Sequence, residues 1–179
     1  MITVISGTNR PGSNTAKVAA LAVDTLRRSE CDVRLLDLAE LPLEIFNSAS
    51  YADKPEGFEP FQQAILDADG ILTIIPEYNG AYPGVMKYFI DMLRFPASLY
   101  EKPAGFIGLS AGPWGALRAV EQLEMVFQYR HAHLFGRRVF IPNVGGCLDD
   151  NGRLADADVI ARLEEAVQGF AEFCRRLTG

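Results

Sequence analysis

The chain has 179 residues, of which 49% are hydrophobic and 22% charged, proportions that are ordinary for a globular protein and exclude a disordered or fibrous one. The length suits one hydrophobic core, and we expect residues 1–179 to form a single domain. A formal net charge of −6 argues against nucleic-acid binding, which needs clustered Lys and Arg side chains against the phosphates.

Short apolar runs alternate with helical patterns along the chain. In chain order, the pattern predicts a strand over residues 2–6, a helix over 15–28, a strand over 33–38, a helix over 58–68, a strand over 70–75, a helix over 82–93, a strand over 104–110, a helix over 116–129, a strand over 134–141 and a helix over 157–177. Because strand and helix alternate throughout, we expect a parallel sheet with helices on both faces. The predicted fold is a doubly wound α/β protein with five strands in the flavodoxin-like order 2-1-3-4-5.

The cysteines and the apolar runs indicate the compartment. Cys31, Cys147 and Cys174 form no CxxC motif, and free thiols in a reducing cytoplasm are favoured over disulfides or zinc. The apolar run over residues 2–5 is too short for a signal peptide, and no run approaches the length of a membrane span. We therefore expect a cytoplasmic protein with no membrane partner.

No metal site is predicted. His131 and His133 are the only histidines, and their i, i+2 spacing places them on different faces of a helix. The acidic turn over residues 149–152 lacks the spacing of an EF-hand, so a plain turn is the better interpretation.

The predicted first strand leads directly into a loop, residues 7–15, that is rich in glycine and hydroxyl side chains. The glycines are Gly7 and Gly12, and the hydroxyls belong to Thr8, Ser13 and Thr15. Arg10 adds a permanent positive charge, and the helix that follows presents unpaired N–H groups and the positive end of its dipole. A role for Ser13 or Asn14 as the cap of this helix would explain one polar residue. It would not explain why the loop also contains two glycines, further hydroxyl groups and Arg10. We therefore predict a phosphate site, and the absence of GxGxxG and GxxxxGK[ST] disfavours a Rossmann dinucleotide site and a Walker NTPase.

A second unusual loop, residues 76–84, follows the predicted third strand. In an open α/β sheet, ligands bind outside the carboxyl ends of the strands where the strand order reverses, here between strands one and three. Both loops therefore border the same crevice, where a flat heterocycle would need a stacking surface and hydrogen bonds at its edge. Tyr78 offers a ring, with half-buried packing as its alternative role, and Asn79 suits a turn. Glu77 is interpreted as a loop-holding or solvent group rather than a base.

A third loop, residues 110–116, follows the predicted fourth strand at the same edge of the sheet. Its small residues permit the close approach of a ring. Trp114, the only tryptophan, covers the ligand, a partner subunit or the edge of the core, and the sequence leaves these alternatives open. The role of the long irregular stretch 42–57 is also left open.

These segments resemble the NADPH-dependent FMN reductases and the related chromate, quinone and azo reductases. Residues 7–15, GTNRPGSNT, are similar to the phosphate loop of that family, Gly-Ser-x-Arg followed by Ser and Asn or Thr. Residues 76–87, PEYNGAYPGVMK, are similar to its motif PEYN-x-x-x-PG-x-x-K, and residues 110–115 are similar to its third flavin loop. The resemblance covers nearly the whole chain, and the PEYN segment is its most specific part.

The resemblance implies a bound FMN cofactor, with NADPH or NADH as the electron donor. The residues implied to bind the FMN phosphate are Thr8, Arg10, Ser13, Asn14 and Thr15; those implied to line the ring, largely through backbone groups, are Pro76, Glu77, Tyr78 and Asn79; and those near its other edge are Ser110 and Gly112. The family is dimeric or tetrameric and a neighbouring subunit completes each flavin site, so the resemblance implies a homodimer or homotetramer.

The sequence departs from the family pattern at three places. Thr8 stands where Ser is usual, which keeps the hydroxyl. Asn14-Thr15 replaces a common x-Asn pair, which leaves open which of the two donates. Gly115-Ala116 replaces a frequent Gly-Gly pair, and we expect the added methyl group to narrow the ring pocket.

The expected activity is hydride transfer from a reduced nicotinamide to flavin N5, and then from the reduced flavin to a small-molecule acceptor such as a quinone, a flavin, an azo compound or a metal oxyanion. The cofactor carries this chemistry, and no catalytic side chain is predicted. The alternatives are a flavodoxin-type electron carrier, whose phosphate loop usually lacks arginine, and a flavin-binding regulatory protein without turnover. A receiver-type signalling domain is disfavoured, because the acids it needs after the first strand are replaced by residues 6–8, SGT.

Overall fold

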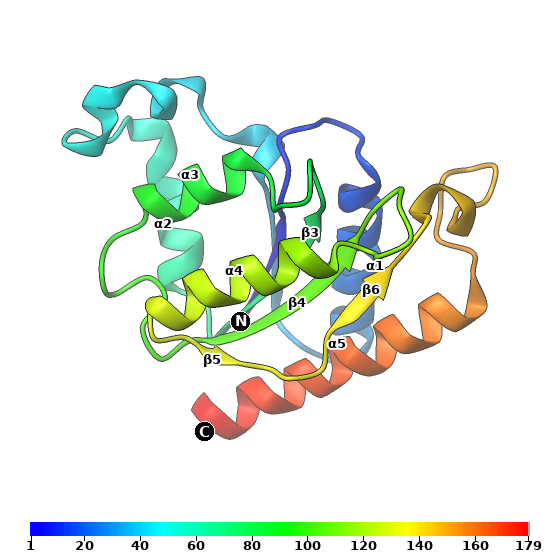
Figure 1. Cartoon of the computed structure of the whole chain (residues 1–179). Coiled ribbons are helices and arrows are strands. Elements are labelled where there is room, and N and C mark those ends of the chain that lie inside the picture. Colours follow the sequence, from blue (N-terminus) through cyan, green and yellow to red (C-terminus); the bar gives the residue numbers. More distant parts are fainter. Residues whose placement is uncertain (179) are drawn as a thin grey trace.

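The computed structural model describes residues 1–178 and contains one parallel sheet between two layers of helices (Figure 1). The strands are β1 (Ile2–Ser6), β2 (Val33–Asp37), β3 (Gly70–Pro76), β4 (Pro103–Leu109), β5 (His133–Leu134) and β6 (Val139–Ile141). Their order is β2-β1-β3-β4-β5, and β6 pairs with β4 beyond the end of β5. The predicted flavodoxin-like order 2-1-3-4-5 is thus confirmed.

Two separate cores hold the helices on the sheet. Helices α1 (Asn14–Arg28) and α5 (Ala157–Thr178) pack on one face, and helices α2 (Glu59–Leu66), α3 (Gly84–Met92) and α4 (Leu117–Tyr129) pack on the other. Every residue of β1, β3 and β4 is buried, as expected for central strands covered on both faces. Gly105 of β4 makes room for Phe170 of α5, because a Cβ atom at this glycine would lie 2.8 Å from the phenyl ring.

The predicted strand over residues 134–141 is wrong as one element. It is broken into β5 and β6 by residues 135–138. Gly136, Arg137 and Arg138 are exposed, and the two arginines form ion pairs with Glu165 and Glu124. Phe135 turns towards α5, where its ring lies 5.9 Å from that of Phe170. The N–H of Phe135 still donates to the carbonyl oxygen of Ala104 at 2.8 Å, and beyond Phe135 solvent and helix contacts replace strand pairing until β6 begins.

The long stretch 42–57 also has local order. It contains the short 3-10 helices Leu43–Phe46 and Ser48–Tyr51, and a third, Glu56–Phe58, leads into α2. The rings of Phe46 and Tyr51 lie 5.0 and 5.7 Å from that of Tyr88, so this segment packs beside α3. Among residues 1–178, no helix is both long and apolar enough to cross a membrane.

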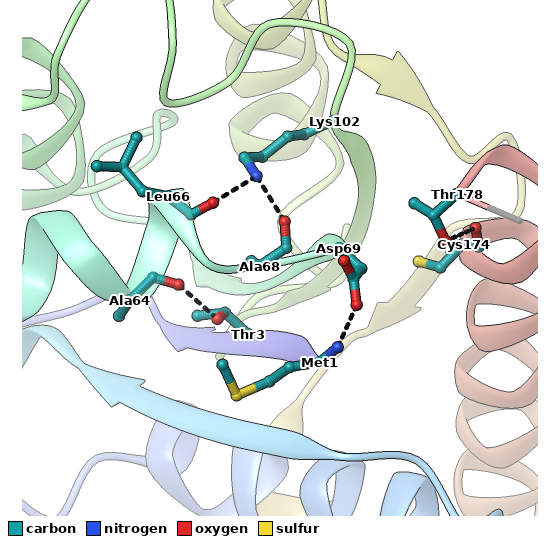
Figure 2. A network of polar contacts seen from close by, with 9 residues as sticks. All are labelled: Met1, Thr3, Ala64, Leu66, Ala68, Asp69, Lys102, Cys174 and Thr178. Carbon is teal, nitrogen blue, oxygen red and sulfur yellow. Dashed lines mark hydrogen bonds and ion pairs between the residues drawn. The ribbon is translucent and has the colours of Figure 1, made fainter.

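A network of hydrogen bonds joins the end of α2 and the segment before β3 to β1 and to the start of β4 (Figure 2). Lys102, just before β4, donates from Nζ to the carbonyl oxygens of Leu66 (3.0 Å) and Ala68 (2.5 Å). Thr3 donates from Oγ1 to the carbonyl oxygen of Ala64 at 2.8 Å. The partly buried lysine thus stabilises the carboxyl end of α2, and its burial lowers the pKa of Lys102 below the ordinary value.

Replacing Lys102 with methionine should lower the free energy of unfolding by about 1–3 kcal/mol, because two partly buried carbonyl groups lose a charged donor. Urea denaturation followed by circular dichroism measures this loss. Lys54→Met is the matched control, since Lys54 is exposed and its replacement should cost less than about 0.5 kcal/mol. Equal stabilities of the two variants would contradict the assigned role of Lys102.

All three cysteines are free, and they differ in reactivity. Cys174 is 3% exposed, and burial raises the pKa of its thiol to about 12. The nucleophilic thiolate of Cys174 is therefore nearly absent at pH 8 and remains so at pH 9. Iodoacetamide should label the partly exposed Cys31 and Cys147 in the native protein, and Cys174 only after unfolding in guanidinium. Peptide mass spectrometry checks this order, and native-state labelling of Cys174 at the rate of Cys31 would contradict it.

Candidate functional site

A cavity of about 400 Å³ lies at the carboxyl ends of β1, β3 and β4. Its lining comes from residues 10–15 after β1, residues 76–78 at the end of β3, residues 109–111 at the end of β4, and Val144 beyond β6. The three loops that the sequence analysis singled out therefore meet at one edge of the sheet (Figure 1). This meeting follows from the parallel order, because parallel strands place all their carboxyl ends together.

The loop after β1 ends at the amino terminus of α1. Ser13 caps this helix, since its Oγ accepts a hydrogen bond from the N–H of Ala16 at 3.2 Å. The first N–H groups of a helix have no partner within the helix, and the helix dipole adds positive potential there. Arg10 lines the same end of the cavity and supplies a full positive charge. This end of the cavity is suited to an anion.

Thr8 and Thr15, both predicted to bind the phosphate, occupy different environments. Thr15 is buried and lines the cavity. Thr8 is fully buried and lies outside the lining, with its Oγ1 2.8 Å from the hydroxyl oxygen of Tyr78. The N–H of Arg10 also points at Thr8 Oγ1, at 3.4 Å. The hydroxyl of Thr8 therefore joins protein groups to one another.

The loop after β3 contains a tight two-residue turn. Asn79 and Gly80 both have positive φ angles, 53° and 78°, as a type I′ turn requires. The turn is closed by paired backbone hydrogen bonds between Tyr78 and Ala81, of 2.8 and 3.1 Å. Gln122 of α4 donates to the carbonyl oxygen of Gly80 at 3.2 Å and fixes the turn from outside. Asn79 is exposed and lies outside the cavity lining.

Glu77 is half-buried at the wall of the cavity. Its N–H donates to the carbonyl oxygen of Leu109 at 3.2 Å, which joins the loops after β3 and β4. Its Oε2 is buried and has no hydrogen-bond partner among residues 1–178. A buried acceptor without a donor is unfavourable by about 1–3 kcal/mol. Because Glu77 lines the cavity, a bound N–H or O–H group that reached Oε2 would supply the missing donor.

The loop after β4 is tied to the segment that follows β6. The N–H of Ser110 donates to the carbonyl oxygen of Ile141 at 3.1 Å. The N–H of Val144 donates to the carbonyl oxygen of Ser110 at 3.0 Å. Gly112 lies outside the cavity lining. Trp114 is 63% exposed, which rules out a role in capping the edge of the core within this chain.

The expected narrowing of the ring pocket by Ala116 does not occur. Ala116 is fully buried and lies outside the cavity lining, against Gly108 of β4. It adopts a φ of 69°, which is unusual for a residue with a side chain. Its methyl group therefore faces the core and leaves the cavity unchanged.

The structure places eight of the eleven predicted site residues around the cavity: Arg10, Ser13, Asn14, Thr15, Pro76, Glu77, Tyr78 and Ser110. Thr8, Asn79 and Gly112 belong to the same loops but lie outside the lining. Val144 was missed by the sequence analysis. Its position just beyond the last strand was the available signal, because ligands gather at carboxyl ends.

The cavity has the size of a small-molecule site, and its lining includes a positive charge suited to an anionic group. Its volume falls within the roughly 300–1,000 Å³ of small-molecule sites. Its lining contains Arg10 and the start of α1, and also Pro76, Leu109 and Glu77, whose Oε2 is buried and unpaired among residues 1–178. Residues 1–178 bring together no group of three or more His, Cys, Asp or Glu side chains suited to a metal ion.

Known proteins are similar to this chain in sequence and in fold. The family model described as NADPH-dependent FMN reductase matches residues 1–145. The chain is 31% identical over 179 residues to an NAD(P)H-dependent FMN reductase of Pseudomonas aeruginosa, with 98% of this chain and 95% of that protein covered. It is 31% identical over 178 residues to a 2-hydroxy-1,4-benzoquinone reductase of a Burkholderia species, with 97% and 96% covered.

A solved structure supports the same relationship. The flavoenzyme FerB of Paracoccus denitrificans, an NAD(P)H:(acceptor) oxidoreductase, superimposes with a TM-score of 0.82 at 25% identity. The superposition covers 98% of this chain and 97% of that one. The similarity therefore extends over the sheet, both helical layers and the three loops of the cavity.

Proposed function

Because the chain belongs to the NADPH-dependent FMN reductase family, we propose that the cavity at the carboxyl ends of β1, β3 and β4 is its FMN site. The observation that carries this proposal is the meeting of three loops around one cavity with the cationic Arg10 at one end. The protein is an NAD(P)H-dependent flavin oxidoreductase. Residues 1–179 would act as one FMN-binding domain.

The residues of this chain would bind and orient the cofactor. Arg10, Ser13 and the N–H groups at the start of α1 would hold the phosphate, with Asn14 and Thr15 beside them. Glu77 would accept a hydrogen bond from an N–H or O–H group of the ligand through its unpaired Oε2. When bound, FMN supplies the hydride chemistry between NAD(P)H and the acceptor.

The acceptor is proposed to be a small planar molecule, with a quinone as the first candidate. The name of the Burkholderia relative, a 2-hydroxy-1,4-benzoquinone reductase at 31% identity, supports a quinone. Free flavins, azo compounds and metal oxyanions remain candidates for an acceptor screen. A location in the cytoplasm is proposed on the three free cysteines and is tested by cell fractionation.

The visible spectrum of the purified protein tests the central proposal. Flavin absorption that bleaches when NADPH or NADH is added without oxygen is the expected result. A colourless protein that takes up no added FMN would overturn the FMN site. A yellow protein that neither nucleotide bleaches would instead indicate an electron carrier or a regulatory flavoprotein.

We further propose that a second copy of the chain covers the surface between α3 and α4, in a homodimer or in a tetramer built from such dimers. A cavity of about 730 Å³ lies there, and three large side chains around it are exposed: Phe95 (67%), Met125 (62%) and Tyr129 (75%). Apolar side chains gathered at one place on a surface are typical of interaction sites.

Light scattering after gel filtration tests this interface. We expect Met125→Glu to shift the protein towards the monomer mass, because a carboxylate would be buried against apolar groups. Leu177→Glu, on the last turn of α5, is the matched control and should keep the wild-type mass. A Met125→Glu protein with an unchanged oligomeric mass would contradict the proposed interface.

A further inference from the structure

The hydroxyl of Tyr78 joins two of the loops that form the cavity. Its oxygen lies 2.8 Å from Oγ1 of Thr8, although the two residues are 70 positions apart in the sequence. Thr8 is fully buried and Tyr78 is half-buried, so this hydrogen bond is partly shielded from water. A shielded hydrogen bond is electrostatically stronger than an exposed one. It therefore fixes the loop after β1 against the loop after β3.

Thr8 and Tyr78 contact both the backbone and the side chain of Arg10. The N–H of Arg10 points at Thr8 Oγ1 at 3.4 Å, and its guanidinium carbon lies 5.9 Å from the centroid of the Tyr78 ring. A hydroxyl has one donor and two acceptor positions, so Thr8 can serve Tyr78 and Arg10 together. A guanidinium at this distance from an aromatic face is attracted to it. The backbone and the side chain of the exposed Arg10 are thus both restrained.

Tyr78 is itself held on a rigid support. Its N–H donates to the carbonyl oxygen of Ala81 at 2.8 Å across the Asn79-Gly80 turn, and Gln122 of α4 fixes Gly80. Because the phenol contacts both Thr8 and Arg10, it restrains Arg10 relative to the turn and to α4. Without this support, a long arginine side chain on a surface loop would lose conformational entropy when it binds an anion.

We propose that Tyr78 is a positioning residue, whose hydroxyl acts through Thr8 and Arg10 to organise the phosphate end of the site before FMN binds. The proposal rests on the FMN site proposed above. It predicts a selective effect: loss of the hydroxyl weakens the binding of FMN more than that of riboflavin, which has the same ring and ribityl chain but no phosphate.

The experiment titrates FMN and riboflavin separately with the flavin-free full chain and follows the quenching of flavin fluorescence. Tyr78→Phe should raise the Kd for FMN about five- to tenfold and the Kd for riboflavin less than twofold. This is the effect expected from losing one hydrogen bond and the restraint that it places on Arg10. Thr8→Val should do the same, and the double variant should be no weaker than the weaker single one. Thr8→Ser keeps the hydroxyl and should bind FMN as the wild type does.

The controls separate this proposal from the FMN site itself. Tyr100→Phe makes the same chemical change at an exposed tyrosine ahead of β4 and should leave both Kd values unchanged. A wild-type protein that binds neither flavin would overturn the FMN site, whereas wild-type binding with equal losses of FMN and riboflavin in Tyr78→Phe would overturn only the positioning role. Unchanged FMN binding in Tyr78→Phe would also overturn it. If Tyr78→Phe does not fold, a Thr8→Val protein that binds FMN like Thr8→Ser overturns the role, and one that loses FMN selectively supports it.

Discussion

Arg10→Gln should raise the Kd for FMN about 10- to 100-fold and leave the Kd for riboflavin within about twofold. Glutamine keeps a polar side chain but removes the only full positive charge in the cavity lining, taken over residues 1–178. Hydrogen bonds between a guanidinium and a phosphate are charge-assisted and contribute about 1.5–3 kcal/mol, which corresponds to this range. Flavin fluorescence titrations at low ionic strength measure both constants.

Arg27→Gln is the matched control for this experiment. Arg27 lies in the last turn of α1, the helix that follows the loop of Arg10; it is exposed and forms an ion pair with Asp24 at 3.7 Å. Its replacement removes the same formal charge from α1 and should change the Kd for FMN less than twofold. If the Arg10 variant lost riboflavin as severely as FMN, Arg10 would be holding the loop in shape rather than binding the phosphate.

The sequence predicted the place of the site because topology determines it. Three runs with unusual composition follow three buried strands, and a parallel sheet puts the ends of these strands at one edge. Arg10, Ser13 and Pro76 could thus be assigned to one cavity without any knowledge of distances. The order of the strands sufficed, since it brings β1 and β3 side by side.

The direction of individual side chains could not be predicted in this way. Thr8 and Ser13 are both hydroxyl residues of one glycine-containing loop, and their composition and spacing do not distinguish them. Burial does: Thr8 is fully buried against Tyr78, whereas Ser13 caps α1 at the cavity. The partner of Thr8 is 70 positions away, so no local pattern could reveal this pairing.

The break in the last predicted strand has a similar origin. Residues 134–141 contain enough apolar residues for a strand, and the pattern gives no reason to divide them. In the structure, Phe135 packs near Phe170 of α5, while Arg138 pairs with Glu124 of α4. These contacts come from helices that lie before and after the strand in the sequence, and they outweigh the local preference.

Gly115→Ala should lower the free energy of unfolding by about 3 kcal/mol and the Tm by roughly 6–12 °C. Gly115 has a φ of 57°, where a side chain costs about 1 kcal/mol. A Cβ atom there would lie 2.7 Å from the backbone nitrogen of Ile141 and 2.9 Å from the carbonyl carbon of Phe140, and these strand atoms of β6 cannot turn aside as a side chain could. Gly112→Ala is the control, because Gly112 is in the same loop with open space around it, and the Tm of this variant should change by less than about 2 °C.

The same substitution should also affect the cavity. The N–H of Ser110 donates to the carbonyl oxygen of Ile141, so a displaced β6 would move the cavity wall. Gly115→Ala should therefore weaken FMN binding at temperatures below its own unfolding. Equal melting temperatures for the two variants would show that β6 can move to accept the methyl group, and that Gly115 is not required for the close approach of the loop after β4 to β6.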